Sequence, residues 1–183
     1  MKAIATAIPD VLLLEPEVFA DERGYLYESW NKRTFAELGI ADMDAGFVQD
    51  NHSKSQRNVL RGLHYQIKHA QGKLIRVTAG EVYDVAVDLR RSSPSFGQWV
   101  GFTLTAEDMR MAWIPPGFAH GFCVTSDSAE LLYKMTDYWS PAHERTLLWN
   151  DPQLAIPWPL TAEPLLTARD VAGRPFDEAE TFA

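Results

Sequence analysis

Alternation of hydrophobic and polar residues with a period of two dominates the middle of the chain. In the clearest example, Val100, Phe102 and Leu104 fall on one face of a run that also contains polar or small residues. Turn signals such as Ala79-Gly80-Glu81 and Pro115-Pro116-Gly117 separate the runs. Strands are predicted over residues 73–78, 82–89, 98–105, 110–114, 119–125 and 130–138. Many short strands at this spacing predict an all-β sandwich or barrel.

Helical signals are few and short. Asn31 is a suitable N-cap for a helix over 32–38, and Gly39 follows as its C-terminal stop. The segment after Asn150 is rich in proline, so we expect it to wrap over the body of the protein. No repeat or linker divides the sequence, which predicts one domain over residues 1–183.

Composition limits the function. The 46% hydrophobic fraction and six tryptophans predict a sizeable core, and a net charge of −8 argues against nucleic acid as a partner. A few clustered basic residues can still form one pocket for a small anion. No apolar run approaches the roughly 20 residues of a membrane helix, and no signal peptide is evident at the N-terminus. We therefore expect a cytoplasmic protein without a membrane partner.

Two histidines stand in phrases with candidate chemistry. His64 closes Arg-Gly-Leu-His, and His120 closes Pro115-x-Gly117-x-x-His120. Histidine is the side chain whose ordinary pKa lies nearest neutral pH, so His64 can move a proton, bind a metal or fill the core. The residues alone leave these three roles open.

The phrase around His120 resembles the second motif of the cupins, which are double-stranded jelly rolls. The first cupin motif has His-x-His and then a glutamate separated from a glycine by six residues. Here Gln66 takes the place of the second histidine, and Lys73 takes the place of the carboxylate before Gly80. An ammonium repels a divalent cation, so this resemblance predicts no metal site. It also predicts that Lys73 points into the barrel, where the carboxylate would stand.

A more specific resemblance covers the chain from about Ile8 to Asp170. It rests on five phrases, supported by Tyr133-Lys134-x-Thr136 and Trp149-Asn150-Asp151-Pro152. The phrases are Phe19-x-Asp21-x-Arg23-Gly24-Tyr25-x-Tyr27-Glu28, Phe47-x-Gln49-Asp50-Asn51-x-Ser53, Val59-Leu60-Arg61-Gly62-Leu63-His64-x-Gln66, Lys73–Trp99 and Trp113–Phe122. Together they resemble the dTDP-4-dehydrorhamnose 3,5-epimerase family of nucleotide-sugar enzymes.

This resemblance implies a cupin-like jelly-roll β-barrel with a few short helices. It implies a cofactor-independent epimerase, which takes dTDP-4-keto-6-deoxyglucose and inverts both carbons beside the ketone, in dTDP-rhamnose biosynthesis. The chemistry is proton abstraction next to a carbonyl and reprotonation from the opposite face. The family also implies a homodimer in which an N-terminal segment carrying Arg23 and Glu28 reaches the partner's site.

The resemblance assigns roles to four catalytic residues. His64 resembles the general base, and Asp170 is the carboxylate that would fix its tautomer. Tyr133 resembles the acid on the other face, because a phenol stays protonated at neutral pH. Lys73 would stabilise the negative charge that develops on the C4 oxygen.

Further residues would bind the substrate. Arg23 and Arg61 suit the diphosphate, because the guanidinium group matches phosphate oxygens. Trp139 stands where many family members have a tyrosine that stacks on thymine, which bears on whether one or both carbons are inverted. The residues implied at the nucleotide and sugar site are Glu28, Gln49, Asp50, Asn51, Lys73, His120, Glu144 and Arg169.

Three alternatives stay open on the sequence. A mono-epimerase acting at C3 or C5 in another deoxysugar pathway would share these motifs. A non-catalytic cupin module that binds a sugar nucleotide would share the fold. A metal-dependent cupin isomerase or dioxygenase is disfavoured by Gln66 and Lys73.

Overall fold

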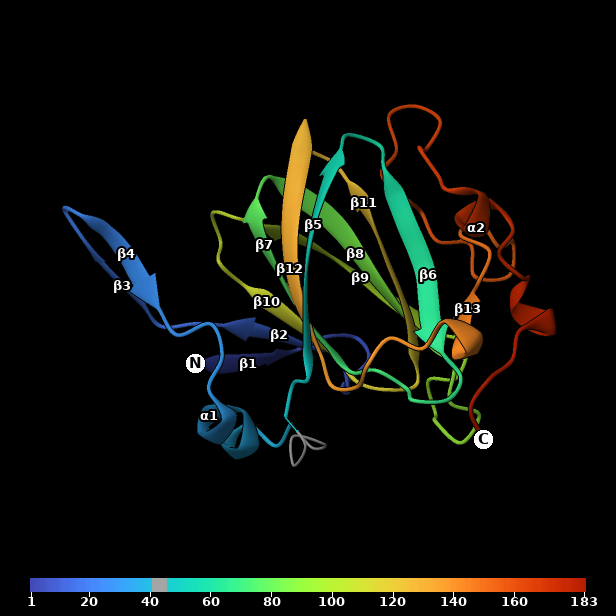
Figure 1. Ribbon diagram of the computed structural model, residues 1–183, viewed down its shortest axis with the longest axis horizontal. Coiled ribbons are helices and arrows are strands. Elements are labelled where there is room, and N and C mark those ends of the chain that lie inside the picture. Colours follow the sequence, from blue (N-terminus) through green and yellow to red (C-terminus); the bar gives the residue numbers. More distant parts are fainter. Residues whose placement is uncertain (41–45) are drawn as a thin grey trace.

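Two antiparallel sheets lie face to face and enclose the core (Figure 1). This is a computed structural model, and it describes residues 1–40 and 46–183. The six-stranded sheet has the order β1-β2-β10-β7-β12-β5, formed by Lys2–Ala5, Leu12–Glu15, Met111–Ile114, Lys73–Ala79, Ser128–Met135 and Gln49–Gln56. The five-stranded sheet has the order β13-β6-β11-β8-β9, formed by Glu144–Thr146, Leu60–Gln66, Phe118–Val124, Glu81–Asp88 and Trp99–Thr105.

The arrangement is a jelly roll rather than a continuous closed barrel. In the described part of the chain, each strand of the two sheets pairs within its own sheet, so hydrogen bonds do not close the barrel that the sequence predicts. Ile75 and Leu131 from one sheet instead pack against Val82, Val100 and Phe122 from the other. Burial of these inner faces holds the sheets together.

The outer faces are covered as well. On the five-stranded sheet, Leu63, Val85 and Val87 pack beneath Ile156 and Phe176 of the C-terminal segment. On the six-stranded sheet, apolar side chains pack beneath helix α1, which spans Lys32–Glu37. Strands covered on both faces carry apolar residues at successive positions, as in the Val85-Ala86-Val87 run of β8.

All six predicted strands are present, as β7 to β12 in chain order. The prediction of a strand over 130–138 is wrong at its end, because β12 ends at Met135. There the backbone of Thr136 bonds Gly72, and the following residues leave the sheet. The hydrophobic pattern does not predict β5, because the inward side chains of this edge strand are all polar: Gln49, Asn51, Ser53 and Ser55.

The predicted helix is confirmed as α1. The Asn31 side chain accepts hydrogen bonds from the amides of Arg33 and Thr34. Gly39 then ends the helix with φ of +71°, a left-handed conformation that favours glycine. No helix within residues 1–40 and 46–183 has the length and hydropathy of a membrane span.

The C-terminal segment runs along the five-stranded sheet (Figure 1). Two short helices interrupt it, α2 at Ala168–Val171 and the 3-10 turn η2 at Phe176–Glu178, and a further 3-10 turn, η1 at Pro141–His143, precedes β13. Isolated bridges tie it to the body at Val59–Leu165, Leu147–Arg174 and Arg90–Phe182. This course brings α2, which carries Asp170, beside β6, which carries His64.

A hairpin projects away from the two sheets at the N-terminal side (Figure 1). It is formed by β3 (Val18–Asp21) and β4 (Gly24–Tyr27). Phe19, Tyr25 and Leu26 are 59%, 61% and 73% exposed, so its apolar side chains have little cover within this chain. Such a surface is typical of a segment that packs on a partner.

Candidate functional site

The inward rows of side chains are apolar at one end of the sandwich and polar at the other. In β7, Lys73 shares the inner face with Ile75 and Val77, and in β12 Tyr133 shares it with Leu131 and Met135. The period of a strand therefore fixes both polar side chains toward the interior. This supports the sequence-based interpretation that Lys73 points into the jelly roll.

These polar rows line a cavity of about 370 Å³ that opens to solvent. A smaller adjoining hollow shares His64, Lys73, Tyr133 and Arg169 with it. The larger cavity is lined by Gln49, Asn51, His64, Tyr65, Gln66, Gln71, Lys73, Tyr133, Met135, Trp139, Glu144 and Arg169. The smaller one adds Arg61, Ile75, His120, Phe122, Leu131, Thr167 and Asp170.

His64 and Asp170 form a close pair, although 106 residues separate them in the sequence. His64 is on β6, and its Nε2 lies 2.6 Å from Oδ1 of Asp170 in α2. The other carboxylate oxygen, Oδ2, accepts from the Thr167 hydroxyl at 2.6 Å. The two residues also form a capping box, in which the Thr167 hydroxyl accepts from the Asp170 amide and the Asp170 carboxylate accepts from the Thr167 amide. The local structure that begins α2 thus also orients the carboxylate toward the imidazole.

The charge states of this pair suit a base. Burial lowers the pKa of His64, which favours the neutral imidazole, although its hydrogen bond to Asp170 opposes the shift. Burial raises the pKa of Asp170, but the hydrogen bonds from His64 and Thr167 outweigh it and bring that pKa to about 2. An ionised carboxylate only accepts hydrogen bonds, so Nε2 carries the proton and Nδ1 keeps its lone pair.

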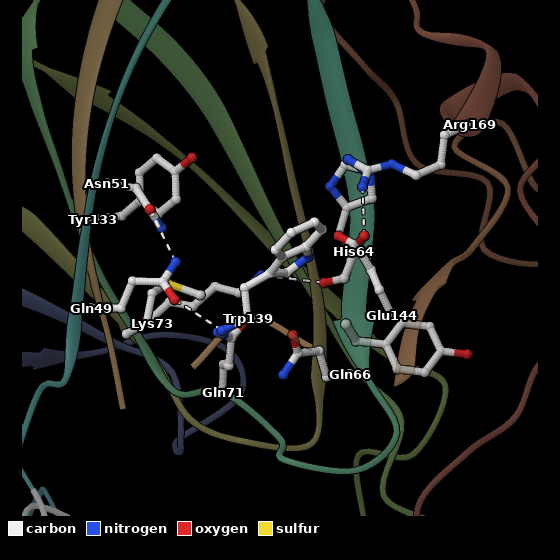
Figure 2. Close-up of a pocket in the computed structure, with 12 residues that line it drawn as sticks. Gln49, Asn51, His64, Gln66, Gln71, Lys73, Tyr133, Trp139, Glu144 and Arg169 are labelled. Atoms are coloured by element: carbon white, nitrogen blue, oxygen red, sulfur yellow. Dashed lines mark hydrogen bonds and ion pairs between the residues drawn. The ribbon is translucent and has the colours of Figure 1, made fainter. Parts of the chain in front are cut away.

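Lys73 is a buried cation of the site. Its side chain is buried, and Nζ donates to the backbone carbonyl of His64 at 3.3 Å (Figure 2). Burial lowers the pKa of the ammonium to about 8, while the carboxylates of Asp84 and Glu144 act in the opposite direction. The group therefore remains charged at neutral pH in a buried position, where its field is stronger than in bulk water.

A second histidine–carboxylate pair stands behind Lys73. His120 Nε2 lies 2.9 Å from Oδ2 of Asp84, and both side chains are buried. The other oxygen of Asp84 is buried without a hydrogen-bond partner among the described residues. Burial lowers the pKa of His120, and the Asp84 carboxylate opposes this shift to a smaller extent. Asp84 thus faces both Lys73 and His120 as the local negative charge.

Tyr133 stands on the opposite wall from His64. It lies on β12 of the six-stranded sheet, whereas His64 lies on β6 of the five-stranded sheet, and both line the cavity (Figure 2). Burial raises the pKa of Tyr133, although the Arg61 guanidinium lowers it to a smaller extent. Its phenol therefore stays protonated. A neutral base and a protonated acid thus flank one space, with a cation between them.

Comparison with known proteins agrees with this geometry. The model of the dTDP-4-dehydrorhamnose 3,5-epimerase family matches residues 5–178. The chain belongs to this family. A curated dTDP-4-dehydrorhamnose 3,5-epimerase from Pseudomonas aeruginosa is 60% identical over 182 residues, which are 100% of this chain and 99% of the relative.

Solved structures share the fold as well. The dTDP-6-deoxy-D-glucose-3,5-epimerase of Legionella pneumophila, in complex with dTDP-4-keto-L-rhamnose, has a TM-score of 0.93 at 50% identity and covers 98% of this chain and 94% of that chain. A 3'-monoepimerase from Streptomyces bikiniensis in complex with dTDP-quinovose has a TM-score of 0.87 at 32% identity, over 94% and 87%. Membership of the dTDP-4-dehydrorhamnose 3,5-epimerase family makes this chain an isomerase.

Most of the residues expected from the dTDP-4-dehydrorhamnose 3,5-epimerase family line the two hollows. Three do not. Asp50 lies on the outer side of β5, where it accepts from Lys134 at 2.9 Å. Arg23 pairs with Asp21 in the projecting hairpin, and Glu28 accepts from Asn31 just before α1. The residues that the structure gathers are Gln49, Asn51, Arg61, His64, Lys73, His120, Tyr133, Trp139, Glu144, Arg169 and Asp170.

Sequence reasoning missed Asp84 and the role of three glutamines, Gln49, Gln66 and Gln71. A signal for Asp84 exists, because it interrupts the inward row that Val82 and Ala86 form on β8. An acidic residue at such a position needs a partner. Within residues 1–40 and 46–183, no group of three or more His, Cys, Asp or Glu side chains could hold a metal ion.

Proposed function

We propose that this chain inverts C3 and C5 of dTDP-4-dehydro-6-deoxy-D-glucose and yields dTDP-4-dehydro-L-rhamnose. The observation that carries the proposal is the His64–Asp170 pair on one wall, Tyr133 on the other and Lys73 at the His64 backbone. The names of the Pseudomonas relative and the Legionella complex support the substrate class.

In the first step, Nδ1 of His64 accepts the proton on C3. The C–H electrons form a C3–C4 double bond, and the carbonyl electrons move to the C4 oxygen as an enolate. Asp170 stabilises the imidazolium, and the Lys73 ammonium stabilises the enolate oxygen. These preorganised groups stabilise the charges that develop in the transition state, and only stabilisation of that state raises the rate.

In the second step, Tyr133 donates its phenolic proton to the carbon from the opposite face. The double bond reverts to the ketone, and the configuration of that carbon is inverted. Solvent then returns a proton to Tyr133 and removes the one on His64, and the same sequence at C5 completes the reaction. This stereochemistry requires acid and base on opposite walls, which matches the placement of Tyr133 and His64 on different sheets.

Substrate binding follows from the remaining residues. Arg61 and Arg169 line the hollows and suit the diphosphate, and Trp139 suits the thymine ring. The exposed apolar hairpin supports a homodimer in which it reaches the partner's cavity. In that arrangement Arg23 and Glu28 act in the partner's site, which accounts for their position outside the cavity of their own chain.

Solvent exchange tests the proposed function. The dTDP-ketosugar is incubated with the protein in D₂O, and deuterium at C3 and C5 is read by NMR. Label at both carbons supports the double epimerase. Label at one carbon supports the alternative mono-epimerase, which is the activity named for the structurally similar Streptomyces protein. Absence of label at both carbons contradicts the catalytic proposal and leaves a sugar-nucleotide-binding module.

Replacement of Tyr133 by phenylalanine separates the two steps. We expect epimerised product to form about 10²-fold more slowly, because the general acid is lost. Exchange of the proton that His64 removes should persist, since His64 and Lys73 are intact. The measurement compares the rates of deuterium wash-in and of product formation in one sample. Equal losses of both rates would show that Tyr133 acts in binding or in the first step.

The reaction should show a bell-shaped pH dependence. His64 must be neutral, and its lowered pKa places the acid limb below the ordinary value of 6.5. Lys73 must be protonated, so the rate should fall as the pH rises through its pKa of about 8. The raised pKa of Tyr133 keeps the phenol protonated across this limb. The profile of kcat from pH 5 to 10 checks this, and a rate still rising at pH 9 would exclude a protonated Lys73.

Mixed dimers test the sharing of sites. Arg23→Ala and His64→Asn should each give homodimers of low activity. After unfolding and refolding as an equal mixture, one site of each heterodimer combines an intact cavity with an intact hairpin. About a quarter of wild-type activity should return, since half the dimers are mixed and have one good site. If no activity returns although gel filtration and cross-linking show mixed dimers, Arg23 does not act across the interface.

A further inference from the structure

The backbone of residues 137–140 is held by three glutamine side chains. Gln71 Nε2 donates to the carbonyl of Asp137 at 2.8 Å. Gln66 Nε2 donates to the carbonyl of Tyr138 at 3.2 Å, and its Oε1 accepts from the amide of Ser140 at 2.7 Å. Gln49 Oε1 accepts from the amide of Trp139 at 2.9 Å (Figure 2). Each backbone position of this loop is thus fixed by a side chain from the body of the protein.

The three glutamines lie on or next to strands of the two sheets. Gln49 begins β5, Gln66 ends β6, and Gln71 lies just before β7, so both sheets contribute to the same loop. Gln49 is itself oriented, because its Nε2 donates to Asn51 at 3.0 Å. The loop is therefore held in a fixed position relative to both sheets, at the mouth of the cavity.

Gln66 is committed to this task. Only 3% of it is exposed, and its amide nitrogen also donates to the carbonyl of His69 at 2.7 Å. Both of its N–H groups are therefore in use, and a bound molecule can find no free donor there. Gln66 also stands where the first cupin motif has a histidine, so the substitution that removes a metal ligand supplies a loop anchor.

The loop presents one large side chain to the cavity. Trp139 lines it, yet 55% of the residue is exposed, so little packing holds the indole in place. A wall of this kind binds a flat ring strongly only when its position is fixed beforehand. Otherwise, binding must also order the loop, which weakens affinity.

We propose that Gln49, Gln66 and Gln71 are positioning residues that hold Trp139 as a preformed stacking wall for the heterocyclic ring of the nucleotide. This inference rests on the proposed function, in which the ligand is a dTDP-sugar. It assigns these glutamines to affinity rather than to proton transfer. Their loss should raise Kd and KM and leave kcat nearly unchanged, because the His64–Asp170 pair and Lys73 keep their contacts.

Gln66→Met tests this, since methionine has a similar length and no hydrogen-bonding amide. We expect Kd for dTDP, measured by calorimetry, to rise about tenfold and kcat for C3 and C5 exchange to stay within about twofold. Gln98→Met is the matched control, because Gln98 is an exposed loop residue outside the cavity lining. If Gln66→Met fails to fold in a thermal melt, Gln71→Met takes its place with the same expectation.

A double-mutant cycle distinguishes positioning from general damage. Trp139→Ala alone should weaken dTDP binding by about 10- to 100-fold, through loss of stacking. In the Trp139→Ala background, Gln66→Met should change Kd by less than about twofold, because there is no ring left to position. An equal effect of Gln66→Met in both backgrounds, or a wild-type Kd for the single variant, would overturn the proposal.

The two proposals fail in different ways. If the wild-type protein neither binds dTDP nor exchanges label, the proposed function is wrong. If it does both, and Gln66→Met binds dTDP as tightly as wild type, only the positioning role is wrong. A fall in kcat as large as the rise in Kd would instead place Gln66 in the proton-transfer machinery.

Discussion

Replacement of His64 by asparagine should lower the rate of deuterium incorporation at both C3 and C5 by about 10³-fold or more, while dTDP still binds. Asparagine keeps a hydrogen-bonding group near Asp170 but has no basic nitrogen, and general-base catalysis contributes about 10²- to 10⁴-fold. Both carbons should lose label because one imidazole serves both inversions. The measurement is NMR of the ketosugar in D₂O with Kd for dTDP determined in parallel.

His52→Asn is the control for this experiment. His52 is an exposed residue of β5 that pairs with Glu130 at 3.0 Å, so the same chemical change there should leave exchange intact. Asp170→Asn should lower the rate as well, because an amide does not fix the imidazole tautomer or stabilise the imidazolium. Exchange near the wild-type rate in His64→Asn would assign the base to another residue.

Replacement of Lys73 by methionine should lower kcat by about 10²- to 10³-fold, the effect of removing one group that stabilises an oxyanion. Methionine occupies a similar volume in the buried position, so the fold should persist. KM should change little, because the charge that Lys73 stabilises exists only once the enolate forms. Steady-state kinetics of label incorporation gives kcat and KM separately.

Lys54→Met is the matched control. Lys54 is an exposed residue of β5 that also pairs with Glu130, so its removal changes the net charge equally and leaves the cavity unaltered. The alkaline limb of the pH profile should also vanish in Lys73→Met, since the group that titrates there is gone. A residual rate within tenfold of wild type, with the limb unchanged, would contradict the role of Lys73.

The strand pattern predicts six of the thirteen strands in the described residues, because strands buried on one or both faces leave a periodic trace in the sequence. All the strands from β7 to β12 follow from it. β5 does not, because its inward side chains line the cavity and are polar, so no hydrophobic alternation marks it. Hydrophobic patterning therefore does not predict the part of the cavity wall that β5 forms.

The site is a similar case. The inward direction of Lys73 is predicted by the resemblance to the first cupin motif, in which Lys73 replaces the metal-binding carboxylate. The pairing of His64 with Asp170 depends on a long-range contact, so only the family resemblance points to it. The contacts of Gln49, Gln66 and Gln71 are made to backbone groups of a loop, and no residue pattern records such contacts. Roles of this type can be inferred only from a three-dimensional structure.

Asp170 comes from the C-terminal segment rather than from either sheet. The two sheets supply the other walls of the cavity, but neither supplies the carboxylate that contacts His64. The imidazole has its fixed tautomer only when residues 168–171 lie beside β6. Activity therefore depends on the docking of the C-terminal segment as well as on the pairing of the strands.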